Sequence, residues 1–316
     1  MHFHFRIQTS KSPPMSAEEV TVGDLEKICL LGKGGVGRVY LSRDKRTGHE
    51  YALKEVVLNS ASRIERLDAE KGALGPLLHR AFEDGDTTSL LMTFLPGDPL
   101  YQSLWQRGHF SEAIAKNCAA QVVASLLDLH ARGYMHRDVK SGNILLNSLD
   151  GRCHLVDFGF AKQHAHCERA MSLCGTYYVM APEVFRRRGY GRAVDWWAVG
   201  VLIYEMVRGM PPWPYKCNDG DMVRYFQRLE EPVDFSAPCF ANPILRALLE
   251  GLLQPDPTAR LTGVDVKHHA WFEGFDWENP KVDMAAEELR KMPSTANAID
   301  SAESVTSAEN ALFAGF

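Results

Sequence analysis

A short polar stretch in the middle of the chain carries three side-chain types that together could transfer a phosphoryl group. Asp138, Lys140 and Asn143 directly precede the apolar run 144–146. The apolar run predicts a short buried strand, which places the three polar residues on the loop that leads into it. Asp138 could accept a proton from a hydroxyl nucleophile, Lys140 could neutralise phosphate charge, and Asn143 could offer an oxygen to Mg²⁺. An ordinary polar turn would explain the stretch equally well unless other parts of a phosphate site occur in order.

A second candidate ligand for a cation lies further along the chain. Asp157 follows the run 154–156 and precedes Phe158 and Gly159. A carboxylate at the end of a strand suits a hard cation, although a turn aspartate would also be found there. Its position one strand pair after Asp138 favours a metal site with Asn143 and Asp157 as its protein ligands.

Three glycines near the N-terminal end could let bare backbone approach phosphate groups. Gly32, Gly34 and Gly37 lie between the runs 28–31 and 38–42, both of which predict strands. A dinucleotide-binding turn has the same glycine spacing, but it requires a helix directly after the glycines and an acidic residue about 20 residues later. Because a strand follows here instead, the pattern favours a loop that covers a nucleotide from between two strands.

Lys54 lies in a third predicted strand, residues 51–57. A lysine in a half-buried strand more often extends its charge to solvent. Behind a glycine loop, however, it is a strong candidate to hold the α- and β-phosphates of a nucleotide. The helical stretch 60–74 would supply its carboxylate partner. Among Glu65, Asp68 and Glu70 we choose Glu70, which lies one turn before Leu74, with Glu65 as the alternative.

The remaining elements follow from the spacing of the apolar residues. Residues 89–92 predict another strand, and the short stretch between Glu70 and this run predicts that a fourth strand is shortened or absent. Residues 111–132 predict a long amphipathic helix with Ser111 as its N-cap, ended by Gly133 just before the polar loop. The helix that opens at Asp195 is apolar on every face, which predicts a buried strut, and Asp195 could cap backbone amides of the polar loop.

Composition narrows the class of protein. The chain has 316 residues, 45% of them hydrophobic and 24% charged, with a formal net charge of −5. This length allows two lobes, and the charge balance gives no sign of nucleic-acid binding. No stretch has the length of a transmembrane helix, so no membrane association is expected. The seven scattered cysteines form no Cys-x-x-Cys pair, which predicts reduced thiols and a cytoplasmic protein.

Taken in order, these motifs resemble the eukaryotic-type protein kinase domain over about residues 25 to 277. The phrasing of residues 155–162, 172–176, 195–206 and 270–277 is most similar to the cyclic-nucleotide-dependent (cAMP/cGMP-dependent) kinases. The resemblance implies an α+β, bilobal fold with a β-rich small lobe over residues 25–95 and a mostly helical large lobe over 96–277. Residues 1–24 would be a flexible leader. Residues 278–316 would be a partly disordered tail whose Phe313 and Phe316 could dock on the small lobe.

The resemblance also implies an ATP- and Mg²⁺-dependent transfer of phosphate to proteins. Asp138 would orient the acceptor hydroxyl, Lys140 would offset charge, and Thr176 would bond to both. Lys140 two residues after Asp138, together with Thr176, is the pattern of serine/threonine kinases. The expected nucleotide-binding residues are Gly32, Lys33, Gly34, Gly35, Val36, Gly37, Val39, Ala52, Lys54, Glu70, Met92, Thr93 and Leu95.

The same resemblance implies how the enzyme would be regulated. Ala181, Pro182 and Glu183 would close the activation segment, and Arg260 would form a buried ion pair with Glu183. Ser172 stands where related kinases carry an activating phosphate, which an upstream kinase would add. Arg137, Lys162 and Arg66 are the expected partners of that phosphate. Any control by a cyclic nucleotide would have to come from a separate regulatory subunit.

Departures from the family's pattern leave the substrate sequence open. Glu205 matches one of the acids with which cyclic-nucleotide-dependent kinases bind arginines, but Pro99, Gly142 and Tyr178 stand where three others are expected. Two other classes share the core fold. A pseudokinase scaffold usually lacks one of the residues equivalent to Lys54, Asp138 or Asp157, all of which are present here. Small-molecule phosphotransferases normally lack the Ala-Pro-Glu segment.

Overall fold

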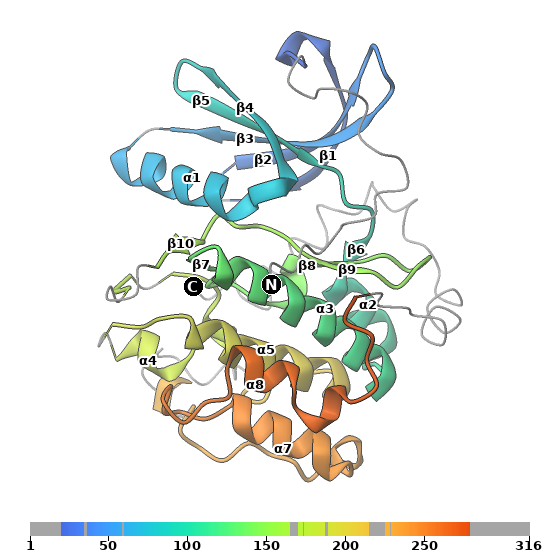
Figure 1. Cartoon of the computed structure of the whole chain (residues 1–316), viewed down its shortest axis with the longest axis vertical. Coiled ribbons are helices and arrows are strands. Elements are labelled where there is room, and N and C mark those ends of the chain that lie inside the picture. The colour runs from blue at the N-terminus through green and yellow to red at the C-terminus, as the bar shows by residue number, and fades with distance from the viewer. Residues whose placement is uncertain are drawn as a thin grey trace.

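A computed structural model describes residues 20–34, 37–58, 60–164, 170–172, 174–186, 189–214, 225–227 and 229–278. Figure 1 shows a small lobe built on a β-sheet and one helix, above a larger, mostly helical lobe. The predicted bilobal α+β fold is therefore confirmed. None of the helices in these residues is long and apolar enough to cross a membrane.

The small lobe is a five-stranded antiparallel sheet in the order β1-β2-β3-β5-β4. The strands are β1 (Leu25–Lys33), β2 (Gly37–Asp44), β3 (Glu50–Val57), β4 (Leu78–Asp84) and β5 (Thr87–Thr93). Alternation along β3 separates two buried faces, because successive side chains point to opposite sides of a sheet. Tyr51 and Leu53 pack in a small outer cluster, whereas Val56 joins the main core. Lys54 shares the inner face with Val56.

The fourth strand is present, so the prediction of a shortened or absent one was wrong. Strand β4 pairs with β5 along its length, with Ala81 opposite Leu90. Helix α1 (Ala61–Leu74) ends where the sequence predicts, and only the turn Gly75–Leu77 separates it from β4. Gly75, with a φ of 53°, and the proline after it stop the helix there, since proline cannot continue an α-helix.

The segment expected to be a flexible leader contributes its last five residues to the fold. Val20 is only 2% exposed and packs in the outer cluster with Leu25 and Leu91. Thr21 and Asp24 hydrogen-bond to each other around the turn Val22–Asp24. Residues 1–19 and the tail from residue 279, with Phe313 and Phe316, lie outside the described residues.

Helices α3 (Glu112–Ala131) and α5 (Ala193–Arg208) form the centre of the large lobe. Ser111 caps α3 as predicted, accepting a hydrogen bond from the Ile114 amide. Trp196 and Trp197 of α5 are fully buried, which confirms that this helix is an internal strut. Further helices with described bounds are α2 (Leu100–Arg107), α4 (Pro182–Phe185), α7 (Pro243–Leu252) and α8 (Gly263–Lys267).

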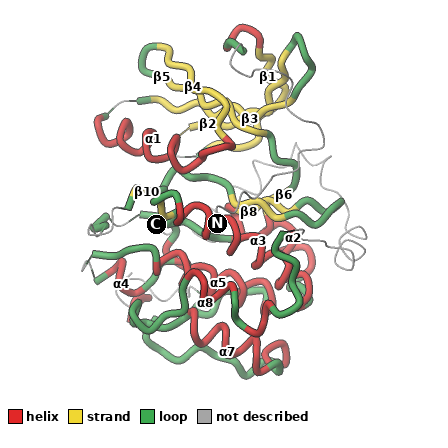
Figure 2. The backbone as a smooth tube through the Cα atoms, viewed as in Figure 1, coloured by secondary structure: helices red, strands yellow, loops and turns green. Residues whose placement is uncertain are grey.

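Short strands on the upper side of the large lobe frame the predicted catalytic loop (Figure 2). They form a three-stranded sheet in the order β6-β8-β9 and a two-stranded sheet of β7 with β10. Their bounds are β6 (Asp98–Pro99), β7 (Tyr134–Met135), β8 (Ile144–Leu146), β9 (Cys153–Leu155) and β10 (Lys162–Gln163). Residues 136–143 therefore join two strands of different sheets, and Asp157 follows β9, as the sequence predicts.

Candidate active site

A buried carboxylate fixes the start of the catalytic loop. Asp195, in the first turn of α5, accepts hydrogen bonds from the backbone amides of His136 at 2.9 Å and Arg137 at 2.7 Å. Its Oδ2 also lies 2.8 Å from Nε2 of His130. Burial opposes its charge, but these hydrogen bonds lower the pKa of Asp195 below its usual range. Arg137 is held at a φ of 70°, a conformation that non-glycine residues rarely adopt.

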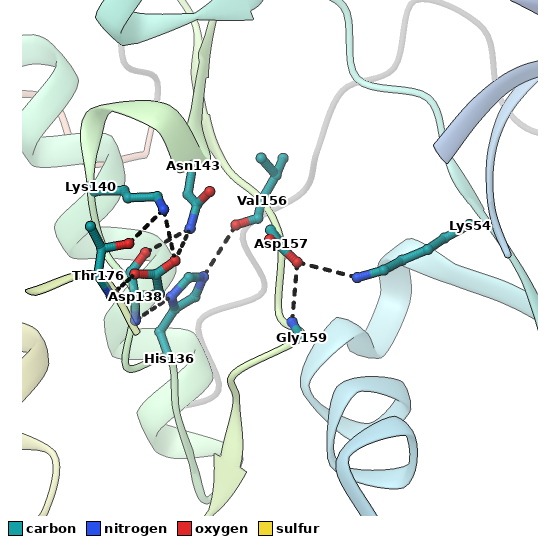
Figure 3. A network of polar contacts seen from close by, with 9 residues as sticks. All are labelled: Lys54, His136, Asp138, Lys140, Asn143, Val156, Asp157, Gly159 and Thr176. Carbon is teal, nitrogen blue, oxygen red and sulfur yellow. Dashed lines mark hydrogen bonds and ion pairs between the residues drawn. The ribbon is translucent and has the colours of Figure 1, made fainter. Parts of the chain in front are cut away.

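Asp138 is oriented by donors on both oxygens (Figure 3). Its Oδ1 accepts from the Thr176 amide at 2.8 Å, and its Oδ2 accepts from Asn143 Nδ2 at 2.8 Å. Lys140 Nζ lies 3.2 Å from Oδ2 and donates to Thr176 Oγ1 at 2.6 Å. Thr176 thus contacts both residues, as the family resemblance implies. The carboxylate is fully buried among these groups and has a single orientation.

His136 connects the catalytic loop to the segment that carries Asp157. Burial lowers the pKa of His136, so the imidazole is neutral. Its Nδ1 accepts from the Asp138 amide at 3.3 Å, which leaves the proton on Nε2 to be donated to the Val156 carbonyl at 3.2 Å. The ring also packs edge-on against Phe158, with centroids 5.2 Å apart.

Lys54 lies between two carboxylates from different lobes. Its Nζ is 2.6 Å from Oε1 of Glu70 and 3.2 Å from Oδ1 of Asp157. Burial works against the ammonium charge, but the two carboxylates raise the pKa of Lys54 above its ordinary value. Glu70 is the partner chosen from the sequence, whereas Glu65 is exposed on the outer side of α1.

Asp157 and Asn143 present oxygen atoms on the same side of the catalytic loop (Figure 3). Desolvation opposes the charge of Asp157, but the Lys54 ammonium and the Gly159 amide lower its pKa, and its side chain is still 46% exposed. Asn143 donates through Nδ2 to the carbonyl and the carboxylate of Asp138, which leaves Oδ1 as an acceptor. One carboxylate and one amide oxygen fit Mg²⁺, which commonly takes its other ligands from water and substrate phosphates.

The predicted nucleotide-binding residues lie on the strands above this site. Gly37 closes the glycine loop, and a Cβ there would lie 2.0 Å from the Glu55 carbonyl, so only glycine fits. Val39 pairs with Lys54, and Ala52 pairs with Met92, in neighbouring strands. The further positions of this set are Gly32 and Lys33 in β1, Gly34 after it, Thr93 at the end of β5 and Leu95 after it. Gly35 and Val36 lie outside the described residues.

Comparison with known proteins agrees with this geometry. The family model for the protein kinase domain matches residues 25–272. The chain belongs to the protein kinase family. It is 36% identical over 284 residues to a human protein named cAMP-dependent protein kinase catalytic subunit PRKX, covering 85% of this chain and 76% of the relative. It is 35% identical over 274 residues to the serine/threonine-protein kinase AtPK1/AtPK6 of Arabidopsis thaliana, covering 82% of this chain. It spans only 57% of that relative.

In this kinase domain the activation segment is joined to the catalytic loop by Arg137. Its Nη1 lies 2.8 Å from Ser172 Oγ and 3.2 Å from the Tyr190 hydroxyl, and its Nε donates to the Phe160 carbonyl at 2.6 Å. Tyr190 in turn donates to the Ser172 carbonyl at 2.6 Å. No hydrogen bond or ion pair of the described residues joins Ser172 to Lys162 or Arg66. The contact with Tyr190 was missed because nothing in the spacing of the sequence marks it.

The end of the activation segment is held by the predicted buried ion pair. Arg260 Nη1 and Nη2 donate to the two carboxylate oxygens of Glu183 at 2.6 and 2.9 Å. Arg260 also donates to the carbonyls of Gln254 and Ala193, and its guanidinium lies 5.1 Å from the ring centroid of Trp197. Both charged groups are buried, so the pair is a structural anchor of the kinase domain.

Proposed function

We propose that this chain is an ATP- and Mg²⁺-dependent serine/threonine protein kinase. The observation that supports this most strongly is the joint arrangement of two clusters. Asp138 is oriented by Thr176, Asn143 and Lys140, and Lys54 lies between Glu70 and Asp157. Every charged group that the phosphoryl-transfer reaction requires is present.

Each residue then has a separate task in the reaction. Lys54 and the backbone of the glycine loop hold the phosphates, and Asp157 and Asn143 hold Mg²⁺, which neutralises charge when it is bound. Asp138 orients the acceptor hydroxyl and takes its proton. Lys140 lies 3.2 Å from Asp138 Oδ2, where it can offset charge on the transferred group.

Serine and threonine are the proposed acceptors, because Thr176 and Lys140 shape the acceptor side of Asp138 in the manner of serine/threonine kinases. We propose only a weak preference for arginines upstream of the acceptor residue. Glu205 is directed at Ser141, whose Oγ lies 3.1 Å from Oε1, and burial raises the pKa of Glu205 to about 7. Pro99 and Gly142 add no charge nearby.

Phosphorylation of Ser172 is proposed to activate the enzyme. The Ser172 hydroxyl already lies beside Arg137, the residue that precedes Asp138. A phosphate would add about −1.5 to −2 charge and strong acceptors at this point, which favours an ordered activation segment. We propose a separate upstream kinase as its source and the cytoplasm as the compartment. The free thiols of Cys29, Cys118, Cys153, Cys174 and Cys239 support that compartment.

A peptide array incubated with radiolabelled ATP and Mg²⁺ tests the proposed function. We expect label on serine and threonine peptides, none on tyrosine peptides, and little loss when upstream arginines are replaced by alanine. Chelation of Mg²⁺ by EDTA should abolish the label. If a protein shown to be phosphorylated at Ser172 binds ATP but transfers no phosphate, it is instead a nucleotide-binding scaffold.

A further inference from the structure

The helix that carries Glu70 ends against the large lobe rather than in a free loop. Helix α1 stops at Leu74, so its last carbonyls, which have no partner inside the helix, lie within one turn of Glu70. In Figure 1 α1 lies between the small-lobe sheet and the β7–β10 pair of the large lobe, and the contacts between α1 and β10 agree with this view. The position of Glu70 therefore depends on what holds this end of the helix.

A single arginine from the large lobe binds those carbonyls. Arg132 follows α3, and its Nη1 lies 2.8 Å from the Ala73 carbonyl and 3.2 Å from the Gly72 carbonyl. Its Nε donates to Asp128 Oδ2 at 2.9 Å, one turn back along α3, which fixes the direction of the guanidinium. The side chain is only 29% exposed. A cation is favourable at the C-terminus of a helix because the helix dipole is negative there.

Two glycines make room for the large-lobe side chains at this end of α1, Gly72 for Tyr134 and Gly75 for Arg132. A Cβ at Gly72 would lie 2.0 Å from the hydroxyl oxygen of Tyr134, and one at Gly75 would lie 2.3 Å from Arg132 Nη1. Glycine inside a helix costs about 1 kcal/mol relative to alanine, so Gly72 needs a packing reason. The Tyr134 ring lying against the bare helix backbone supplies one.

The same tyrosine belongs to the strand that leads into the catalytic loop. Tyr134 lies in β7, where it pairs with Gln163 of β10, and β7 runs directly into His136 and Asp138. Arg132 and Tyr134 thus connect the end of α1 to the same short segment that positions the catalytic aspartate. The positions of Glu70 and Asp138 therefore both depend on the short segment of the large lobe that contains Arg132 and Tyr134.

We propose that Arg132 is a positioning residue that holds α1 so that Glu70 meets Lys54. It acts through Glu70 and touches no reacting group. Because Arg132 and Tyr134 lie outside the activation segment, the Lys54–Glu70 pair forms without a phosphate on Ser172. This inference rests on the proposed function, and its test includes one readout that does not depend on activity.

The kinetic test uses the Arg132→Gln variant of the full chain. We expect kcat/KM for ATP to fall about tenfold, since small misplacements of a positioning group have effects of this order or larger. The KM for the peptide substrate should not change. Arg132→Lys should recover part of the loss, because an ammonium can still bind the carbonyls. Arg246→Gln is the matched control, because Arg246 forms the same kind of pair within a helix, with Glu250, far from the site.

A double-mutant cycle separates positioning from general stability. If Arg132 acts through Glu70, Arg132→Gln should have little further effect on kcat/KM in a Glu70→Gln protein. A tenfold loss in both backgrounds would overturn the proposal, and so would an unchanged kcat/KM in the single variant.

Hydrogen exchange tests the contact independently of phosphoryl transfer. In Arg132→Gln, amides of residues 68–74 should exchange at least about tenfold faster, as expected when local opening of a helix end becomes easier. Amides of α5 should not change. Unchanged protection of residues 68–74 in Arg132→Gln would overturn the proposal even if the wild-type enzyme is active. If the wild-type protein is inactive but these amides still exchange faster in the variant, the contact stands and only the proposed function is refuted.

Discussion

Single replacements in the site remove one charged group at a time, so the rate and the stability of each variant are measured together. Asp138→Asn keeps the size of the side chain but removes the proton acceptor, and Lys54→Met removes the cation between Glu70 and Asp157. Each variant should lose at least about 100-fold in kcat, because proton transfer and electrostatic positioning contribute factors of this size. A steady-state assay beside a melting curve checks both the rate and the fold.

Asp150→Asn is the control for these variants, since Asp150 is an exposed turn residue of the neighbouring hairpin that pairs with Arg152. It should retain normal turnover. Near-normal turnover in Asp138→Asn, at an unchanged melting temperature, would show that the assigned mechanism is wrong.

Glu205 gives stability a pH dependence of known sign. Burial raises its pKa in the folded protein to about 7, and its Oε2 has no hydrogen-bond partner among the described residues. Between about pH 4.5 and 7 the unfolded chain loses this proton while the folded chain keeps it, so stability falls as pH rises. Glu205→Gln removes the effect. The difference in free energy of unfolding between the variant and wild type should therefore shift in favour of the variant by up to about 3 kcal/mol from pH 4.5 to pH 8.

Urea unfolding of both proteins at pH 4.5, 6 and 8 measures this difference directly. Because all other titrating groups are shared, only Glu205 contributes to the change in the difference. A difference that stays constant across this range would mean that Glu205 has the same pKa in the folded protein as in the unfolded chain.

At the scale of elements, the buried pair of Arg260 and Glu183 fastens α4 to the segment that follows α7. Removing one partner leaves a buried charge unpaired, so Arg260→Ala or Glu183→Ala should each lower the free energy of unfolding by roughly 3–5 kcal/mol. The double variant should lose less than the sum. Chemical denaturation of the four proteins gives the coupling energy. Strict additivity would contradict the contact seen between the two side chains.

The activation segment is the element that Ser172 would control. Its hydroxyl lies beside the Arg137 guanidinium, whose other hydrogen bonds in the described residues go only to the neutral Phe160 carbonyl and Tyr190 hydroxyl. Ser172→Ala or phosphatase treatment should reduce activity at least about tenfold, and Arg137→Ala should make activity insensitive to the state of Ser172. Mass spectrometry of residues 160–180 establishes that state. Full activity of Ser172→Ala without any phosphate in this segment would refute the switch.

The sequence predicts well those parts of the site that lie close together along the chain. The loop with Asp138 and Asn143 and the order of the strands around Lys54 follow from local patterns of apolar and polar residues. The prediction for β4 failed because the sequence does not show how short the link after the helix can be: α1 ends at Leu74, as predicted, and only the turn Gly75–Leu77 separates it from β4. The contacts of Arg132 with Ala73 and of Arg137 with Tyr190 join distant segments that no local pattern relates.

At the scale of the whole molecule, the groups proposed to hold MgATP come from both lobes. Lys54 belongs to the small lobe, whereas Asp157 and Asn143 belong to the large lobe. A ligand that binds only the folded protein stabilises it by an amount set by its concentration relative to Kd, about 2.7 kcal/mol at 100 times Kd. ATP with Mg²⁺ should therefore raise the melting temperature.

ATP with EDTA should give a clearly smaller rise, because Asp157 and Asn143 are proposed to act on the nucleotide through the cation. Asp157→Asn should reduce the shift in the presence of Mg²⁺ and have less effect in its absence. An equal shift with and without Mg²⁺ would show that the cation makes no contribution to nucleotide binding.

The end of α1 against Arg132 and Tyr134 also bears on inhibitor design. A compound that fits only when Glu70 has moved away from Lys54 must select a rare conformation, and its apparent affinity is reduced by the fraction of molecules in that conformation. Opening this kinase domain means separating the Arg132 guanidinium from two helix carbonyls as well as breaking the Lys54 ion pair. Compounds of that type should bind the wild-type protein weakly and the Arg132→Gln variant more tightly. Compounds that contact only Ala52 and Met92 should bind both proteins equally well.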